Sequence, residues 1–332
     1  MSEGNLDSGA LRQILDLLAD GQFHSGEELG LLLGVSRAAV WKHLQKLEGL
    51  GICLSSIKGK GYCIEGGLEL LDIKKIKATL ASTLPLTIKI FPQIDSTNSH
   101  LMRDERPAMQ ICLAETQTAG RGRRGRQWIS PFAQNIYCSV GWGFEGGVAS
   151  LEGLSLVVGL VIVRALKLHG ISGLELKWPN DVLYQNQKLA GILIEMRGDP
   201  AGYCEVIIGI GINVSMANIN AEVITQPWID LRTIAVQQGV ASLSRNLLVA
   251  TLIDELTEVL ASYQQAGFAD YRAEWESINA HAGQIVELHN GALVNRGVCI
   301  GVTEVGALVL ETKNGKEVFH GGELSLRPVH DS

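Results

Sequence analysis

The sequence lacks most of the patterns that assign a chain quickly to a known chemistry. It has no GxxxxGK[ST] phosphate loop, no GxSxG nucleophile motif and no HExxH zinc motif. Its six cysteines are scattered without a CxxC pair, and its eight histidines form no cluster. This distribution argues against a disulfide framework or a zinc site, and it favours reduced thiols in a cytoplasmic protein.

Signals for export or membrane insertion are also missing. The first residues, MSEGNLDSGALRQ, have neither a basic region nor an apolar core, so they do not resemble a secretory signal. The most apolar run, Leu154–Leu166, is shorter than a bilayer span and contains Arg164. We therefore expect this run to form a buried helix, and we expect no membrane partner.

The length and net charge of the chain indicate how many domains it has and which binding partners it can have. The chain has 332 residues, of which 46% are hydrophobic and 19% charged, as is ordinary for a globular protein of two or three domains. The formal net charge of −7 argues against a protein that coats nucleic acid over its whole surface. Any site for a polyanion must be local.

Residues 1–66 have the pattern of a winged helix-turn-helix. Three amphipathic stretches, the second and third preceded by Ser25 and Ser36 as helix caps, lead into a hairpin with the basic tip KGKG. Five basic residues and one acidic residue fall between Ser36 and Gly61, although residues 1–66 have six basic and eight acidic. A solvated basic face would have the same composition, but motif and charge coincide here. The expected DNA contacts are Ser36, Arg37, Lys42, His43, Lys46, Lys58 and Lys60.

The remainder divides into a body and a small cap. Strands and helices without strict alternation over residues 67–275 predict a central α+β domain, a mixed sheet covered by helices on one face. Five short β runs with glycine at the turns over residues 276–332 predict a C-terminal SH3-like β-barrel. The expected fold class is therefore multi-domain α+β, divided at 1–66, 67–275 and 276–332.

The loop Gln117–Trp128 is the most unusual stretch, because it contains four arginines and three glycines within seven residues. Glycines let backbone N–H groups approach a ligand, and guanidinium groups bind phosphate or carboxylate with two parallel hydrogen bonds. A solvated basic loop or an RNA-binding RGG segment would share this composition. RGG segments are usually long and repeated, however, whereas this loop occurs once between a predicted strand and Trp128.

Three further motifs lie downstream. Lys177–Asp181 (KWPND) predicts a turn with side-chain acceptors, and Gly209–Asn213 (GIGIN) lacks the GxGxxG of a dinucleotide site. Glycines at 209 and 211 would let a ligand lie against a strand. In Lys188–Gly191 (KLAG) the lysine either extends out to solvent or points into a pocket as a fixed positive charge.

With Asp95–Asn98 (DSTN) and Gly321–Arg327 (GGELSLR), these motifs occur in the order seen in biotin–protein ligases. The N-terminal winged helix makes the chain similar to the bifunctional type, which is both biotin ligase and biotin operon repressor. The resemblance implies that biotin and Mg²⁺-ATP form biotinyl-5′-adenylate, and that biotin then passes to a lysine of the biotin carboxyl carrier protein of acetyl-CoA carboxylase. It also implies that the adenylate-bound enzyme is a homodimer that binds operator DNA.

The same resemblance implies the candidate site. Arg123 and Lys188 are the expected catalytic residues: Arg123 would retain the reactive adenylate, and Lys188 would lie beside the biotin carboxylate and the α-phosphate. The arginine loop is expected to be disordered before ligands arrive. Biotin would contact Ser96, Thr97, Asn98, Gln117, Gly120, Arg121, Gly122, Arg123, Lys188, Gly191, Gly209 and Gly211. ATP or the adenylate would contact Arg123, Arg126, Asn180, Lys188, Asn213, Trp228 and Arg327, and no metal ligand is identified.

Two segments depart from the family pattern, Asp199–Gly202 and Pro227 before Trp228. Two other functions stay open: a lipoate or octanoate transferase of related fold, and a biotin-sensing repressor without ligase turnover. The transferases lack an arginine loop combined with KWPND. Intact Arg123 and Lys188 argue against the sensor.

Overall fold

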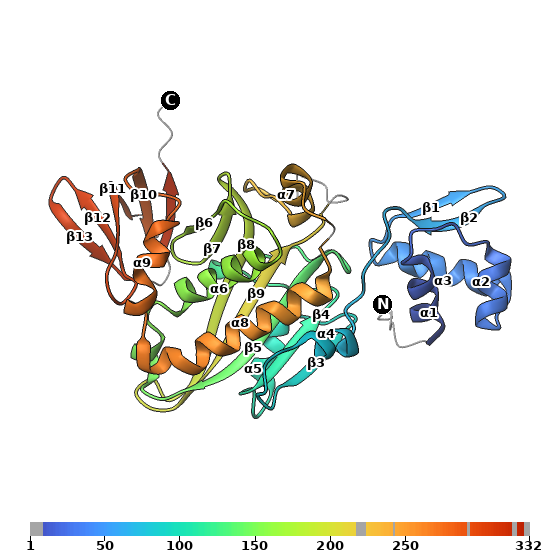
Figure 1. The fold of residues 1–332 in the computed structure, drawn as a ribbon, viewed down its shortest axis with the longest axis horizontal. Helices are drawn as coiled ribbons and strands as arrows, with labels where there is room; N and C mark the ends of the chain where they lie inside the picture. The colour runs from blue at the N-terminus through green and yellow to red at the C-terminus, as the bar shows by residue number, and fades with distance from the viewer. Residues whose placement is uncertain (1–8, 217–223, 242, 291–292, 321–323, 329–332) are drawn as a thin grey trace.

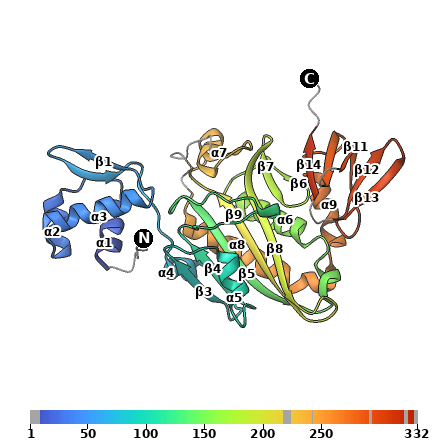
Figure 2. The ribbon, with the colours of Figure 1, turned by 180° about the vertical axis from the view of Figure 1, so that it is seen from behind.

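The structure, a computed structural model, describes residues 9–216, 224–241, 243–290, 293–320 and 324–328. Three units follow one another along the chain, and the first and the last lie at opposite ends of a central sheet (Figures 1 and 2). This confirms the multi-domain α+β class, whereas the boundaries after residues 66 and 275 stay predictions.

The N-terminal unit is the expected winged helix-turn-helix. Ser25 caps the second helix with a reciprocal bond to Glu28, and Ser36 caps the third. Gly34 ends the second helix at φ 63°, a left-handed conformation that glycine adopts without strain. The elements are α1 (Gly9–Leu18), α2 (Gly26–Leu33), α3 (Arg37–Gly49), β1 (Leu54–Ile57) and β2 (Gly61–Ile64).

His24 ties the start of α2 to the hairpin, because its backbone pairs with Tyr62 and its ring contacts Asp20 and Glu28 at 3.1 and 3.2 Å. Burial lowers the pKa of His24, but the hydrogen bonds to the two carboxylates outweigh burial and leave the pKa raised. Protonated His24 therefore stabilises the folded N-terminal unit. This contribution is complete below the unfolded pKa of about 6.5, and it is lost as the pH rises through the raised pKa of His24 in the folded state.

We therefore expect the N-terminal unit of the full-length chain to unfold at a lower temperature at pH 8 than at pH 6. Exchange of its amide hydrogens at the two pH values measures this. His24→Gln should remove most of the difference, and an unchanged pH dependence in that variant would refute the assignment to His24.

The central unit is a seven-stranded mixed sheet in which only β3 and β4 are parallel neighbours. In spatial order the strands are β3 (Thr87–Phe91), β4 (Gln110–Ala114), β5 (Asn135–Phe144), β9 (Cys204–Asn213), β8 (Gln187–Gly198), β7 (Asp181–Tyr184) and β6 (Leu174–Lys177). Among the described residues its helices are α4 (Ile73–Thr79), α5 (Thr97–Arg103), α6 (Leu154–Leu168), α7 (Leu231–Gln238), α8 (Arg245–Ala266) and α9 (Ala269–Ser277).

Helices cover both faces of this sheet, so the prediction of helices on one face was wrong. Ile208, Ile210 and Ile212 of β9 point into the large core formed with α6 and α8. Ile207 points to the opposite face, where it packs with Leu101 of α5. The alternation of a strand separates these two sets. Of the other β9 residues on the second face, Gly209, Gly211 and Asn213 line a cavity, and Glu205 pairs with Arg197.

Helix α6 is the buried helix that the sequence predicts. The stretch Gly147–Leu168 is long and apolar enough to cross a bilayer by length and composition alone. Ten of the fifteen residues of α6 are buried in the core, however, as in the central helix of a globular domain.

The C-terminal unit is an antiparallel sheet in the order β13-β12-β11-β10-β14, as expected for a small SH3-like barrel. Trp178 joins it to the central unit by donating its indole N–H to the Gly306 carbonyl at 3.0 Å. Its strands are β10 (Ile285–Asn290), β11 (Leu293–Val302), β12 (Leu308–Thr312), β13 (Gly315–Phe319) and β14 (Leu324–Pro328).

Candidate functional site

A cavity of about 1120 Å³ opens on the face of the sheet that α6 and α8 leave uncovered. This volume slightly exceeds the roughly 300–1,000 Å³ of most small-molecule pockets, so it has room for two ligands. Its walls come from the arginine loop, the KWPND turn, β8, β9, residues 224–228 and, at the C-terminal unit, His281, Gln284 and Leu326.

Nearly all the residues predicted for the site line this cavity. Gly120 does not: a Cβ there would lie 2.7 Å from the Trp128 carbonyl oxygen, so it supports Trp128 instead. Arg327 pairs with Glu287 between β14 and β10, but its side chain lies outside the described residues, as do residues 321–323 of the GGELSLR motif. The lining includes Ser96, Thr97, Asn98, Gln117, Arg121, Gly122, Arg123, Arg126, Asn180, Lys188, Gly191, Gly209, Gly211, Asn213 and Trp228.

The lining is strongly cationic. Among the described lining residues Asp181 is the one carboxylate, against six basic side chains. Such an excess in a concave, partly water-excluded site favours anionic ligands. The six are Arg121, Arg123, Arg124, Arg126, Lys177 and Lys188.

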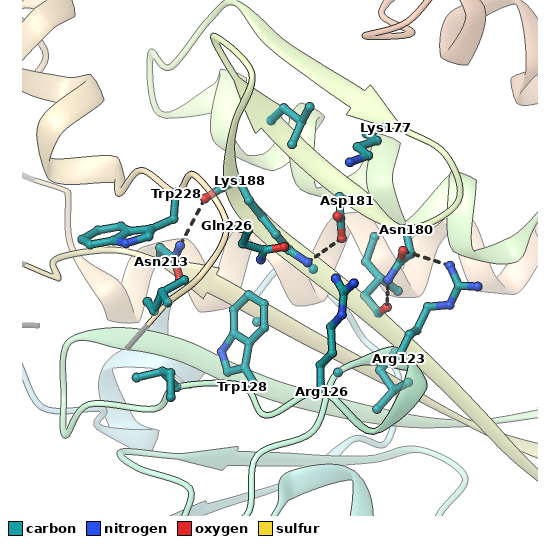
Figure 3. Close-up of a pocket in the computed structure, with 18 of the residues that line it drawn as sticks. Arg123, Arg126, Trp128, Lys177, Asn180, Asp181, Lys188, Asn213, Gln226 and Trp228 are labelled. Carbon is teal, nitrogen blue, oxygen red and sulfur yellow. Dashed lines mark hydrogen bonds and ion pairs between the residues drawn. The ribbon is translucent and has the colours of Figure 1, made fainter. Parts of the chain in front are cut away.

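Lys188 points into the cavity rather than out to solvent (Figure 3). Its Nζ lies 2.6 Å from Asp181 Oδ1 and 5.4 Å from the centroid of the Trp128 ring. Both members of the ion pair are largely shielded, with side chains 16% and 17% exposed. The ammonium is thus held ready for a ligand carboxylate or phosphate that competes with Asp181.

Arg123 anchors the arginine loop across the cavity. Its Nη1 donates to Asn180 Oδ1 at 3.1 Å, and Asn180 Nδ2 donates to the Ile192 carbonyl at 2.8 Å (Figure 3). Burial lowers the pKa of Arg123, and Asp181 opposes that shift. Gly122 N–H donates to the Arg126 carbonyl at 2.7 Å, so the loop is folded here; its disorder without ligand stays a prediction.

A neutral polar pocket lies beside the start of α5. The Gln117 side-chain oxygen accepts from Thr97 N–H at 2.9 Å, and Ser139 Oγ lies 2.7 Å from Thr97 Oγ1 and 2.6 Å from Asn98 Oδ1. Asn98 Nδ2 donates to Glu195 Oε2 at 2.9 Å. Paired donors and acceptors of this kind suit a neutral ligand group such as a ureido ring.

Ser96 and Arg121 support the rim of this pocket. Ser96 Oγ caps α5 by accepting from Ser99 N–H at 3.3 Å, so this hydroxyl is already used by the helix. Arg121 Nη2 lies 3.1 Å from both carboxylate oxygens of Glu195 and 3.0 Å from Ser99 Oγ. Arg121 therefore lies at the rim in an ion pair, with its side chain 45% exposed.

The strand glycines accommodate side chains of the protein itself. A Cβ on Gly209 would lie 2.3 Å from Asn98 Oδ1, and one on Gly211 would lie 2.6 Å from the Trp128 ring. A Cβ on Gly191 would also meet this indole, at 3.0 Å from its Cζ3. In this structure the Asn98 amide and the Trp128 indole lie against these glycines, which also line the cavity; that a ligand lies against the strand here stays a prediction.

Trp128, Ser139 and Glu195 are the site residues that sequence reasoning missed. Trp128 is part of the arginine-loop motif and Glu195 lies on the strand β8 that contains the KLAG motif, so proximity to the motifs could have suggested both. Ser139 carries no local signal, because it is buried in the apolar strand β5. Only the pairing of Ser139 with Gly209 brings it to the pocket.

Asn213 lines the cavity, and its side-chain amide also holds one of the cavity walls in place. Its Nδ2 donates to the carbonyls of Lys188 and Ile229 at 3.3 and 3.1 Å, and Lys188 N–H donates to the Pro227 carbonyl at 3.0 Å (Figure 3). These bonds fix the segment that carries Trp228 against the edge of β8. The Trp228 indole is thereby set on the cavity wall.

The predicted DNA-contacting residues lie on α3 and the hairpin of the N-terminal unit, which stands at one end of the central sheet (Figure 1). Ser36 is occupied as the cap of α3. Burial and the nearby Lys46 lower the pKa of His43, so this histidine adds no charge at pH 7. The exposed cations are Arg37, Lys42, Lys46, Lys58 and Lys60.

Comparison with known proteins agrees with this geometry. Residues 90–213 match the model of the biotin/lipoate A/B protein ligase family, and residues 10–63 match an HTH domain. The bifunctional ligase/repressor BirA of Escherichia coli K12 is 41% identical over 95% of this chain and 96% of its own length.

A biotin–[acetyl-CoA-carboxylase] ligase of Mycobacterium tuberculosis is 32% identical over 71% of this chain and 88% of its own. The biotin protein ligase of Aquifex aeolicus, solved with biotin and ATP, is 29% identical with a TM-score of 0.63, covering 73% of this chain and 99% of that one. With a ligase fold, a winged helix and this identity over nearly its whole length, the chain belongs to the family of bifunctional biotin ligase/repressors.

Proposed function

We propose that this protein joins biotin to ATP as biotinyl-5′-adenylate and transfers the biotin to a lysine of the biotin carboxyl carrier protein of acetyl-CoA carboxylase. The observation that carries this proposal is one cavity with a neutral polar pocket at one end and six cationic side chains against Asp181. Biotin has a neutral ureido ring and a carboxylate, and ATP is polyanionic. The cavity matches both substrates in this order.

The biotin end is formed by uncharged groups. Thr97, Asn98, Gln117 and Ser139 would exchange hydrogen bonds with the ureido ring, since their side chains already form a network of donors and acceptors. The Trp128 indole would lie along the apolar part of the ligand. The carboxylate would then reach Lys188, whose Nζ lies 5.4 Å from the centroid of this indole.

Adenylation brings the biotin carboxylate and the ATP α-phosphate together, and these two anions repel each other. The cationic side chains of the cavity would therefore lower the barrier by neutralising this charge. A carboxylate oxygen of biotin attacks the α-phosphorus, and the bond from that phosphorus to the bridging oxygen breaks as pyrophosphate leaves. Lys188 would bind the carboxylate and the α-phosphate, and Arg123 with Asn180 would hold the α-phosphate side. Arg126 and Arg327 would bind phosphates, and Trp228 would stack on adenine.

Mg²⁺ fits the acidic side of this site. It usually binds one or two carboxylates and completes its shell with water and substrate phosphates. Among the described residues no three His, Cys, Asp or Glu side chains gather into a metal site, so Asp181, with the neighbouring Asn180 amide, is the donor set available to it. When bound, the ion would neutralise charge on the pyrophosphate leaving group.

In the second step the amine of the carrier lysine attacks the adenylate carbonyl, an amide forms, and AMP leaves. The folded arginine loop would keep water and other lysines away until the carrier docks.

Incubation with ATP, biotin and a carrier domain, followed by mass spectrometry of the carrier, tests the proposal. One biotin amide per carrier is expected. Labelling by lipoate or octanoate instead would indicate the transferase, and bound biotin without labelling would indicate a sensor.

We further propose that the adenylate-bound protein dimerises and represses the biotin operon from the cytoplasm. The basic face of α3 and the hairpin support operator binding, and six free cysteines suit a reducing compartment. Ordering of the ligand loops would couple the cavity to dimerisation, because order–disorder changes can link two sites.

Deleting residues 1–66 should abolish operator binding in a gel-shift assay, because the recognition helix and hairpin are removed. As a folded control, replacing Lys58 and Lys60 with glutamine should weaken binding and reduce the slope of log affinity against log salt by about 3.6, because the dimer loses four lysines at about 0.9 each. An unchanged gel shift after the deletion would refute the assignment of this unit to DNA.

A further inference from the structure

The outer face of α3 contains one residue that its charges do not explain. Helical spacing brings Arg37, Ala38, Trp41, Lys42 and Gln45 to this face, and all five are exposed. The opposite face is buried in the core of the N-terminal unit. Trp41 is thus a large apolar side chain, 52% exposed, among cations in the middle of the predicted recognition helix.

The described residues leave about half of the Trp41 side chain uncovered. Trp41 belongs neither to the buried core of its unit nor to the partly buried side chains that pack against that core. It borders a hollow of about 400 Å³ between α3 and the hairpin, lined also by Gly26, Arg37 and Tyr62. Leaving so much apolar surface in water is unfavourable, so a partner that covers it gains binding energy.

Charge identifies the class of partner. Arg37 and Lys42 flank Trp41 on α3, and Lys58 and Lys60 lie at the exposed hairpin tip of the same unit. This arrangement matches a DNA phosphate backbone. An indole is uncharged and has a single N–H donor, so it adds little to phosphate binding. Its surface suits an apolar group, and in the major groove that group is the C5-methyl of thymine.

We propose that Trp41 reads the operator sequence, packing its indole on thymine methyl groups in the major groove while the surrounding cations hold the phosphates. This assignment rests on the proposed repressor function. It separates two tasks on one helix: Lys42 contributes affinity for any DNA, and Trp41 contributes preference for particular base pairs.

The test begins with selection of duplexes from a random-sequence pool by the full-length protein with biotin, ATP and Mg²⁺. Each thymine of the selected half-sites is then replaced by deoxyuridine, which removes the methyl group and nothing else. For the wild-type protein we expect a loss of affinity of about four-fold for each methyl contacted, or about 15-fold when both half-sites are changed.

Trp41→Ala should bind the thymine operator more weakly and should not distinguish thymine from uracil. Its salt dependence and its affinity for random DNA should be unchanged, and Trp41→Phe should restore part of the preference. Lys42→Ala is the matched control on the next residue: it should lose affinity for all duplexes, reduce the salt slope by about 1.8 because the dimer loses one lysine in each half-site, and keep the preference for thymine.

Equal sensitivity to uracil in the wild type and in Trp41→Ala would overturn the proposal. A weaker dimer of Trp41→Ala in sedimentation, with an unchanged preference for thymine, would place Trp41 in a protein contact and also overturn it. If the wild-type protein enriches no sequence at all, the repressor function fails and the assignment fails with it. Thermal unfolding confirms that each variant is folded.

Discussion

Replacing Lys188 with methionine should lower the rate of adenylate formation by about 10²- to 10³-fold, the cost typical of removing one group that stabilises developing charge. The ammonium lies 2.6 Å from Asp181 and faces the cavity, so it is the cation placed to bind a carboxylate and a phosphate together. Methionine has a similar length without charge. Biotin-dependent exchange of labelled pyrophosphate into ATP measures the step without the carrier.

Asp181→Asn is the matched control for Lys188→Met, because it breaks the same ion pair from the other side. Lys188 would then keep its charge without its partner, so biotin should bind at least as well as in the wild type. The need for Mg²⁺ should rise if Asp181 is a metal ligand. An exchange rate for Lys188→Met within about three-fold of the wild type would remove Lys188 from the catalytic set.

Arg123→Gly should leave adenylate synthesis running and release the intermediate about 10- to 100-fold faster, as expected for a lost charge-assisted hydrogen bond. The guanidinium closes the loop over the cavity through Asn180, and glycine removes that closure. Released biotinyl-adenylate should then acylate lysines of unrelated proteins. Mass spectrometry of bovine serum albumin added to the reaction measures this labelling.

Two variants separate the role of Arg123 from general loosening of the chain. Arg123→Lys keeps the charge but loses the paired N–H donors, so its release rate should lie between those of the wild type and glycine. Arg106→Gly places a new glycine on an exposed segment outside the cavity and should label only the carrier. If Arg123→Gly labels no added protein and releases no adenylate, the proposed role is wrong.

The helices and strands predicted from the sequence agree closely with the structure where interactions between nearby residues determine them. The caps of α2 and α3 follow from serines placed before amphipathic stretches, because a hydroxyl satisfies an N–H group three residues along. Helix α6 (Leu154–Leu168) contains the whole predicted run Leu154–Leu166, because that run is apolar except for Ser155 and Arg164. β7 and α7 were missed, since a turn motif and a short polar helix give weak periodic signals.

The candidate site contains residues that local sequence patterns predicted and residues that they did not predict. Motifs named Arg123, Asn180 and Lys188 in advance because each lies in an unusual local pattern, and all three line the cavity. Their partners were not foreseeable in the same way. Ser139 enters the polar pocket through the register of β5 on β9, and a shift of one residue would turn it into the opposite core.

By itself the sequence determined the family, the three kinds of unit and most of the cavity's residues, because these depend on contiguous motifs and short-range periodicity. Only the tertiary structure decided that α5 covers the second face of the sheet, that Lys188 turns inward to Asp181, and that Trp128 fills the space above Gly211. Each of these depends on side chains distant in sequence that compete for the same volume. Local patterns cannot encode the outcome of that competition.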